Sequence, residues 1–72
     1  MLLQAGIYEH SKSKKRYEVI GVARHSETLE EMVVYRALYG EQDLWIRPLK
    51  MFLENVEIGS ETLPRFRYVG KE

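Results

Sequence analysis

The stretch RHSETLEEMVVYRALYG, residues 24–40, decides which fold this chain adopts. Read as a helix, it begins at a capping box formed by Thr28 and Glu31 and ends at Gly40, where a C-terminal cap belongs. Four apolar side chains have the spacing of one helical face: Leu29, Met32, Val33 and Ala37. The helical interpretation places this segment in a bundle.

Other features of the same stretch favour a strand. Residues 33–35, Val-Val-Tyr, lose side-chain freedom in a helix and are typical of strands. The alternation of aromatic residues continues through a GEQD turn, residues 40–43, to Trp45, which is the pattern of a hairpin. We therefore predict a polar loop at residues 25–31 and a strand at residues 32–39.

The rest of the chain is typical of short strands separated by turns. Strand patterns also occupy residues 6–10, 16–24, 44–48 and 55–58. Pro48 begins a single helical turn near residues 48–53. Residues 59–72 form an extension that has the pattern of a further strand and a frayed end. We predict one all-β domain with its core at about residues 6–58.

Composition limits the class of protein. The 72 residues allow one domain, and no apolar segment approaches the roughly 20 residues of a membrane span. The absence of cysteine excludes disulfides and thiolate metal sites and favours a reducing cytoplasm. Eleven basic and eleven acidic residues give a formal net charge of zero. That balance lowers the expectation of a nucleic-acid protein and permits weak self-association between copies.

The histidines do not form a recognisable metal site. Consecutive strand residues point to opposite faces, so Glu9 and His10 do not share one ion. His10 and His25 would still lack a third ligand, which a zinc site needs. We predict no metal ion, and we expect each imidazole to stack on a tyrosine or to bond a backbone carbonyl.

The string His25-Ser26-Glu27 contains the side-chain types of a hydrolase triad. Members of a triad meet from distant segments and need an oxyanion hole beside them, so adjacency argues against this interpretation. The chain also lacks a Gly-rich phosphate loop. We predict no catalytic residue and no cofactor, and a small enzyme that uses His10 and His25 is the least favoured class.

A set of aromatic and polar residues most needs a functional explanation. Trp45 and Arg47 share one strand face and can stack, with the guanidinium aimed at a carboxylate or a phosphate. The candidate ligand-binding residues are Tyr8, His10, His25, Tyr35, Tyr39, Trp45 and Arg47. The alternative is that these rings form the core and that Glu27, Glu30 or Glu31 neutralises Arg47.

Several strings also carry a family resemblance. They are GxYxH at residues 6–10, YEV at 17–19, ARHSETLEE at 23–31, VVYRALYG at 33–40 and LWIRPLKMF at 44–52. On these strings the chain resembles the bacterial domain of unknown function 1653 over residues 6 to about 53. The resemblance implies a small SH3-type β-barrel of about five short antiparallel strands, which supports the strand interpretation, and it implies no activity. The chain departs from the family at residues 11–15, where members have a Tyr-Lys-Gly-type turn.

Three function classes follow. The first is a non-catalytic binding module whose aromatic and arginine groove holds a peptide, a nucleotide or single-stranded nucleic acid, by analogy with other SH3-type barrels. The second is a structural domain that associates weakly with itself and buries the same aromatic residues. The third is the small enzyme. None of the three involves a membrane.

Overall fold

The computed structural model describes residues 3–71. The elements are β1 (Gly6–His10), β2 (Arg16–Arg24), β3 (Glu31–Ala37), β4 (Leu44–Pro48), α1 (Leu49–Phe52), β5 (Asn55–Ile58), β6 (Glu61–Pro64) and β7 (Phe66–Gly70). The stretch at residues 24–40 is a loop followed by β3, as the strand interpretation predicted. No helix within residues 3–71 has the length and apolar character needed to cross a membrane.

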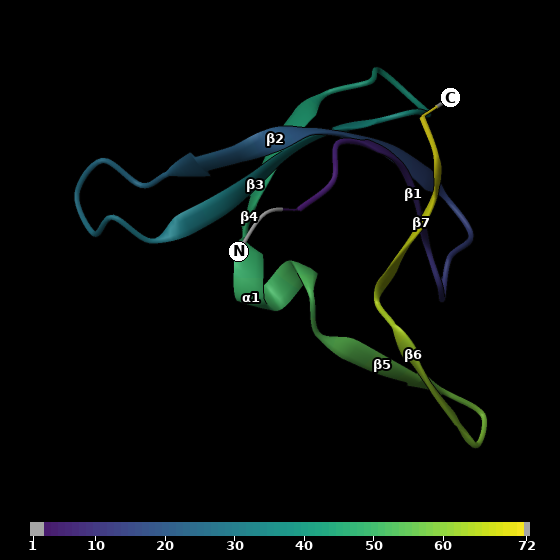
Figure 1. The fold of residues 1–72 in the computed structure, drawn as a ribbon. Coiled ribbons are helices and arrows are strands. Elements are labelled where there is room, and N and C mark those ends of the chain that lie inside the picture. Colours follow the sequence, from purple (N-terminus) through teal and green to yellow (C-terminus); the bar gives the residue numbers. More distant parts are fainter. Residues whose placement is uncertain (1–2, 72) are drawn as a thin grey trace.

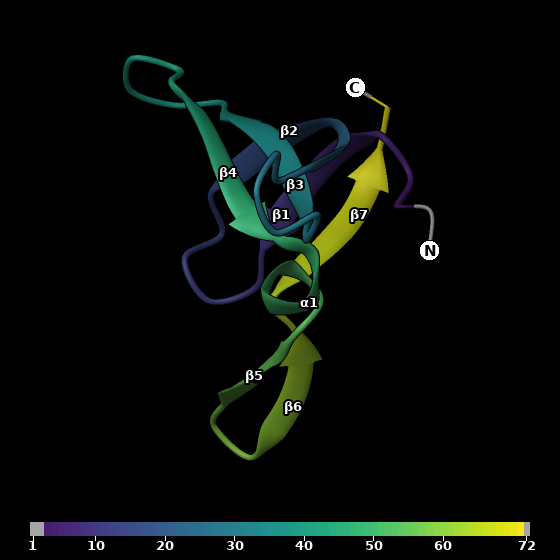
Figure 2. The same ribbon diagram turned by 90° about the vertical axis from the view of Figure 1, so that its left-hand side faces the viewer.

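Five strands form one antiparallel sheet in the order β4-β3-β2-β1-β7, and β5 pairs with β6 as a separate hairpin. The hairpin projects from the body beyond α1 (Figures 1 and 2). The all-β class and the short helix near residues 48–53 are confirmed. The SH3-type barrel is not confirmed, because β4 and β7 remain two separate edges of an open sheet. The described residues form seven strands where we expected about five.

The core lies between one face of this sheet and α1, which sits beneath it (Figure 1). The helix begins directly after Pro48 and is one turn long, and it buries Leu49 and Phe52, which are three positions apart. Its other residues, Lys50 and Met51, are exposed. The buried cluster comes from β1, β2, β3, α1 and β7: Tyr8, Val19, Val33, Tyr35, Leu49, Phe52 and Phe66.

The C-terminal residues contribute to this core. Phe66 begins β7 and stacks face to face on Phe52, with the ring centroids 4.1 Å apart and an interplanar angle of 3°. The hydroxyl of buried Ser11 donates to the carbonyl of Pro64, and the Ser11 backbone N–H donates to the Arg65 carbonyl over 2.9 Å. These bonds fasten the β1–β2 loop to the junction of β6 and β7.

Gly6 is required where β1 and β7 approach each other. Its φ is +142°, and a Cβ there would lie 2.8 Å from the Gly70 carbonyl oxygen and 2.8 Å from the Tyr68 ring. We therefore expect Gly6→Ala to lower the free energy of unfolding by about 2 kcal/mol, because both the backbone and the packing must shift. Urea denaturation measures the difference.

Gly21→Ala in β2 is the matched control. Its φ is not in the positive range, and an added Cβ would meet nothing within 4 Å. We expect a change within about 0.5 kcal/mol. Equal destabilisation by the two substitutions would contradict the close approach of Gly6 to β7.

Candidate functional site

A shallow hollow opens on the core face of the sheet beside the β4 edge. Its volume is about 220 Å³. The lining residues are Tyr17, Tyr35, Tyr39, Trp45 and Arg47. The β3–β4 register brings them together, because Trp45 lies directly opposite Tyr35 and Arg47 lies opposite Val33. Four of the seven predicted ligand-binding residues therefore meet in one place.

Tyrosine rings form the inner wall of the hollow. The hydroxyl groups of Tyr17 and Tyr39 are hydrogen-bonded over 2.8 Å, and the Tyr17 ring meets those of Tyr35 and Tyr39 edge-on at 5.5 Å between centroids. Burial, followed by the hydrogen bond between the Tyr17 and Tyr39 hydroxyl groups, raises the pKa of Tyr17 to about 12. Tyr17 is therefore a neutral ring that contacts both of its tyrosine neighbours. Tyr17 was not among the predicted ligand-binding residues, although its place opposite Ala37 follows from the β2–β3 pairing.

Arg47 supplies a positive charge to the hollow. Its guanidinium lies 5.7 Å above the centre of the Phe66 ring, and the residue is half-buried. Within residues 3–71, the ion pairs join Glu9 to Arg16 and Arg67, and Glu54 to Arg65. None of them involves Arg47, so the neutralisation of Arg47 by a loop glutamate is not observed in the described part of the chain.

The strand that carries Trp45 and Arg47 is an open edge of the sheet (Figure 2). Three consecutive large apolar residues on it are more than half exposed: Leu44 at 57%, Trp45 at 52% and Ile46 at 63%. Trp45 faces the hollow, whereas Leu44 and Ile46 point to the opposite face. The other edge, β7, contributes none of the large exposed hydrophobic residues of the described chain.

Tyr8 lies outside the hollow, in the core. It is 5% exposed, its ring packs edge-on against Phe52 and Tyr68, and its hydroxyl donates to the Gln4 carbonyl over 2.7 Å. Burial, and to a lesser extent Tyr68, raises the pKa of Tyr8. Tyr8 is therefore placed as a packing residue.

His10 also lies outside the hollow and begins the loop between β1 and β2. Its Nδ1 accepts the backbone N–H groups of Lys12 and Ser13 over 3.2 and 3.3 Å, and its carbonyl accepts the N–H of Lys14 over 2.8 Å. The imidazole packs edge-on against Phe66 at 5.0 Å. The ring therefore contacts a phenylalanine instead of the expected tyrosine, and Nδ1 accepts N–H bonds instead of bonding a carbonyl.

His25 begins the loop between β2 and β3 in the same way. Its Nδ1 accepts the N–H groups of Glu27 and Thr28 over 3.1 and 3.3 Å, and its carbonyl accepts the N–H of Leu29 over 2.8 Å. The histidines flank opposite ends of β2, a strand of nine residues. At about 3.3 Å per residue β2 itself spans roughly 26 Å, so the histidines beyond its two ends do not converge on one site.

The two loops share a short sequence pattern that we did not predict. His10-Ser-Lys-Ser and His25-Ser-Glu-Thr place a histidine first and a hydroxyl residue fourth. That hydroxyl accepts the N–H two residues later in each loop, from Lys15 and from Glu30. Lys14 and Leu29, the residues that follow, have φ values of 66° and 65°. The His-Ser repeat was the available signal, and it indicates a shared loop structure.

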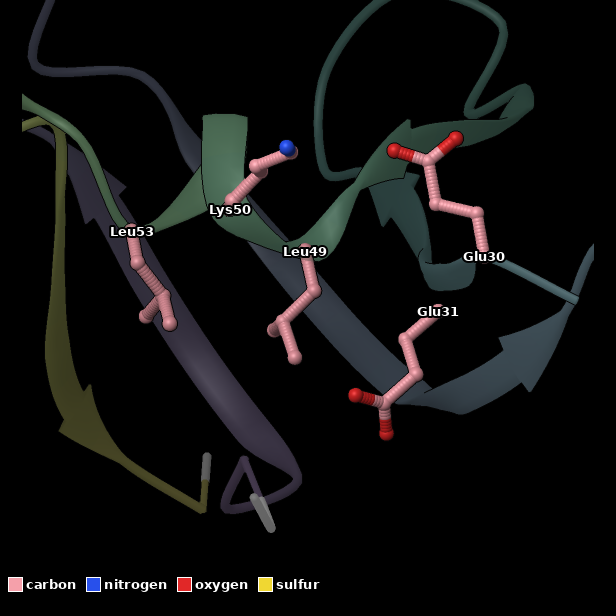
Figure 3. A pocket seen from close by; sticks show the side chains of 5 residues that line it. All are labelled: Glu30, Glu31, Leu49, Lys50 and Leu53. Carbon is pink, nitrogen blue, oxygen red and sulfur yellow. The ribbon is translucent and has the colours of Figure 1, made fainter.

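A second hollow, of about 290 Å³, lies between α1 and the start of β3. Figure 3 shows Leu49 and Leu53 pointing to the same side, whereas Lys50 points away from them. Glu30 and Glu31 complete its lining. Among the ion pairs within residues 3–71, none joins Lys50 to either glutamate. This hollow is lined by two leucines, two glutamates and one lysine. Its lining does not include a serine, threonine or cysteine that could act as a nucleophile.

The lining of the first hollow is suited to binding. It presents phenol rings, an indole and a guanidinium, which stack on flat groups and bond to anions. It includes no carboxylate and no histidine to accept a proton. Across residues 3–71, no three His, Cys, Asp or Glu side chains gather closely enough to hold a metal ion.

The open antiparallel sheet, with α1 packed beneath it, defines a small all-β domain. The chain belongs to the family described as "Protein of unknown function (DUF1653)", whose family model matches residues 6–68. It is similar to a family member from Bordetella bronchiseptica whose crystal structure is known. The two share 38% sequence identity and a TM-score of 0.88, over 97% of this chain and 91% of that chain. No curated protein matches. The family predicted from the sequence strings is confirmed, and it carries no assigned activity.

The surroundings of His10 predict that the free energy of unfolding depends on pH. Burial, and then the positive charges of Arg65, Arg47 and Lys12, lowers the His10 pKa below its usual 6.5. Between the folded-state pKa and 6.5, the unfolded chain binds more protons than the folded one, so stability rises with pH. We expect the melting temperature to fall as the pH drops from about 7.5 through 6.5. His10→Asn keeps an acceptor for the loop and should reduce this fall.

His25→Asn is the control, because it changes the histidine of the matching loop. Thermal unfolding followed by circular dichroism at a series of pH values compares the three proteins. A pH dependence that disappeared in His25→Asn and persisted in His10→Asn would contradict the assignment to His10.

Proposed function

We propose that this domain is a non-catalytic binding module that holds an extended peptide segment along β4. The observation that carries the proposal is the open β4 edge with the aromatic and arginine hollow beside it. An edge strand offers unpaired backbone groups for strand addition, and side-chain pockets next to it supply selectivity.

The backbone pattern identifies which groups are available. The Asp43 carbonyl accepts the Ala37 N–H over 3.1 Å, so residues 37 and 43 are a hydrogen-bonded pair. Bonded and non-bonded pairs alternate along an antiparallel ladder, so Trp45 and Arg47 also bond to β3. Leu44 and Ile46 therefore point their N–H and C=O groups outward. Pro48 ends the strand and has no N–H to offer.

The hollow supports recognition of an acidic peptide. Arg47 is held by its contact with Phe66 and has no ion pair within the described chain, which leaves its donors available for a carboxylate. Trp45 is exposed and offers a flat face for an apolar or aromatic side chain, whereas Lys15 Nζ lies over the Tyr39 ring at 4.5 Å. A hollow of about 220 Å³ accommodates one or two side chains.

The other classes have weaker support. A nucleotide or a single strand of nucleic acid would use the same rings, but it would leave the outward backbone groups of β4 unpaired. The net charge of zero also gives no general attraction to phosphates. An enzyme would need a proton acceptor in the hollow, and its lining includes none. The absence of cysteine supports a reducing cytoplasm as the compartment.

An NMR titration tests this function. We expect extended peptides that contain an acidic residue among β-branched residues to shift the amide signals of Leu44 and Ile46. Ile46→Pro removes an outward N–H without removing a bond to β3, and it should weaken binding about tenfold or more. Shifts that avoid β4, or unchanged affinity in Ile46→Pro, would contradict strand addition.

The role of Arg47 is tested by a matched pair of variants. Arg47→Met removes the charge in the hollow and should weaken binding of the acidic peptide about tenfold, because it removes a charge-assisted bond. Arg36→Met makes the same change on neighbouring β3, where Arg36 lies opposite Leu44 on the other face of the sheet. Arg36 is half-buried, donates to the Gln42 carbonyl over 3.5 Å and does not line the hollow. We therefore expect no more than about a twofold effect there.

A further inference from the structure

The β4 edge is too apolar for a strand that meets only water. Leu44, Trp45 and Ile46 are each more than half exposed, and they are consecutive, so either face of the strand presents apolar area. An exposed apolar edge is the feature that natural sheets avoid unless another chain covers it. The second observation is a charged residue at each end of the run, Asp43 before it and Arg47 after it.

These two charges select one occupant. In a twofold antiparallel pairing centred on Trp45, Leu44 of one copy lies opposite Ile46 of the other, and Asp43 lies opposite Arg47. The same ion pair then forms twice, as the symmetry requires. Leu44 and Ile46 are the residues with outward backbone groups, so this register forms four N–H···O=C bonds.

The alternative symmetric registers lose interactions. Centring the pair on Ile46 places Leu44 opposite Pro48, which cannot donate, and leaves Asp43 opposite an uncharged leucine. Centring it on Leu44 requires residue 42 to continue the strand, but Gln42 has a φ of 57° and lies in the turn. The pairing centred on Trp45 uses only residues 43–47, which are Asp43 and the first four residues of β4.

The side chains agree with this register. Residues 43, 45 and 47 alternate with Leu44 and Ile46, whose backbone groups bond to the second copy. They therefore form the non-hydrogen-bonded pairs of the dimer, in which opposing Cα atoms are only about 4.5 Å apart. That separation suits an Asp–Arg ion pair and brings the two Trp45 rings together. These side chains lie on the face that carries the hollow, so the hollows of the two copies adjoin across the twofold axis.

We propose that the peptide segment held by β4 is β4 of a second copy, so that two five-stranded sheets join into one and Asp43 of each copy pairs with Arg47 of the other. The inference rests on the proposed function and names its partner. Arg47, which has no ion pair within the described chain, gains one in the dimer. The contact is limited to one pair of short strands, so association is weak, with a Kd of about 0.1 mM.

Sedimentation velocity of the full chain from about 10 µM to about 1 mM measures this equilibrium. We expect the wild type to shift from monomer to dimer across that range. Asp43→Arg alone and Arg47→Asp alone each place two like-charge pairs in the interface, so each should associate at least about tenfold more weakly.

An equimolar mixture of the two variants restores the charge complementarity. The Asp43→Arg chain carries arginine at both positions, and the Arg47→Asp chain carries aspartate at both. In the mixed dimer an arginine therefore faces an aspartate at each end of the paired strands, and the mixture should dimerise like the wild type. Recovery in the mixture also shows that both single variants are folded.

Glu57→Arg on β5 is the matched control, because it reverses a charge on a strand outside the five-stranded sheet, and it should dimerise like the wild type. A wild type that stays monomeric at about 1 mM, or a mixture that stays as weak as its components, would overturn the inference.

The peptide titration distinguishes the two proposals. If the wild type is monomeric and peptides shift Leu44 and Ile46, the self-pairing is wrong and the binding function stands. If the wild type is monomeric and peptides leave β4 unchanged, both proposals are wrong.

Discussion

The stacking of Phe52 on Phe66 is the contact on which the rest of the structure depends. It joins α1 to β7, which belong to segments on either side of the projecting hairpin, and it puts two parallel rings 4.1 Å apart beneath the sheet. The rings of Tyr8 and Tyr35 pack edge-on against Phe52. Residues from β1, β3, α1 and β7 therefore share one aromatic centre. In a chain of 72 residues, burial of each large ring contributes a substantial part of the net stability.

The same ring also positions the candidate site. Phe66 contacts the guanidinium of Arg47 at 5.7 Å, the imidazole of His10 at 5.0 Å and the Tyr17 ring at 5.5 Å. Arg47 is thus held over an aromatic face, where a cation is stabilised without a carboxylate beside it. The core and the hollow are two sides of one aromatic cluster, so the charge in the hollow is oriented before any ligand arrives.

Much of this arrangement was predictable from local patterns. The alternation of side chains across the GEQD turn predicts β3 and β4 and also their register. In that register Trp45 lies opposite Tyr35, and Arg47 lies opposite Val33 on the same face. Phe66 was not predictable as a core residue, because its partner is set by the path of the chain through β5 and β6. Barrel closure is likewise a matter of global strand pairing, and here β4 and β7 remain separate edges. We expected each histidine ring to stack on a tyrosine or to bond a backbone carbonyl. In the repeated loop pattern, which was not recognised, Nδ1 accepts two backbone N–H groups instead.

Arg47 couples the hollow to His10, although the imidazole is not part of the lining. Its positive charge is one cause of the lowered His10 pKa, after burial and after Arg65. A carboxylate that binds Arg47 offsets that charge and therefore raises the His10 pKa. By linkage, protonation of His10 strengthens the binding of an acid at Arg47 to the same degree. The effect does not require a conformational change, because both groups already pack against Phe66. The coupling has the same sign for the Asp43 carboxylate of a second copy and for the carboxylate of another peptide, so acidification within the range where His10 titrates favours occupation of the β4 edge.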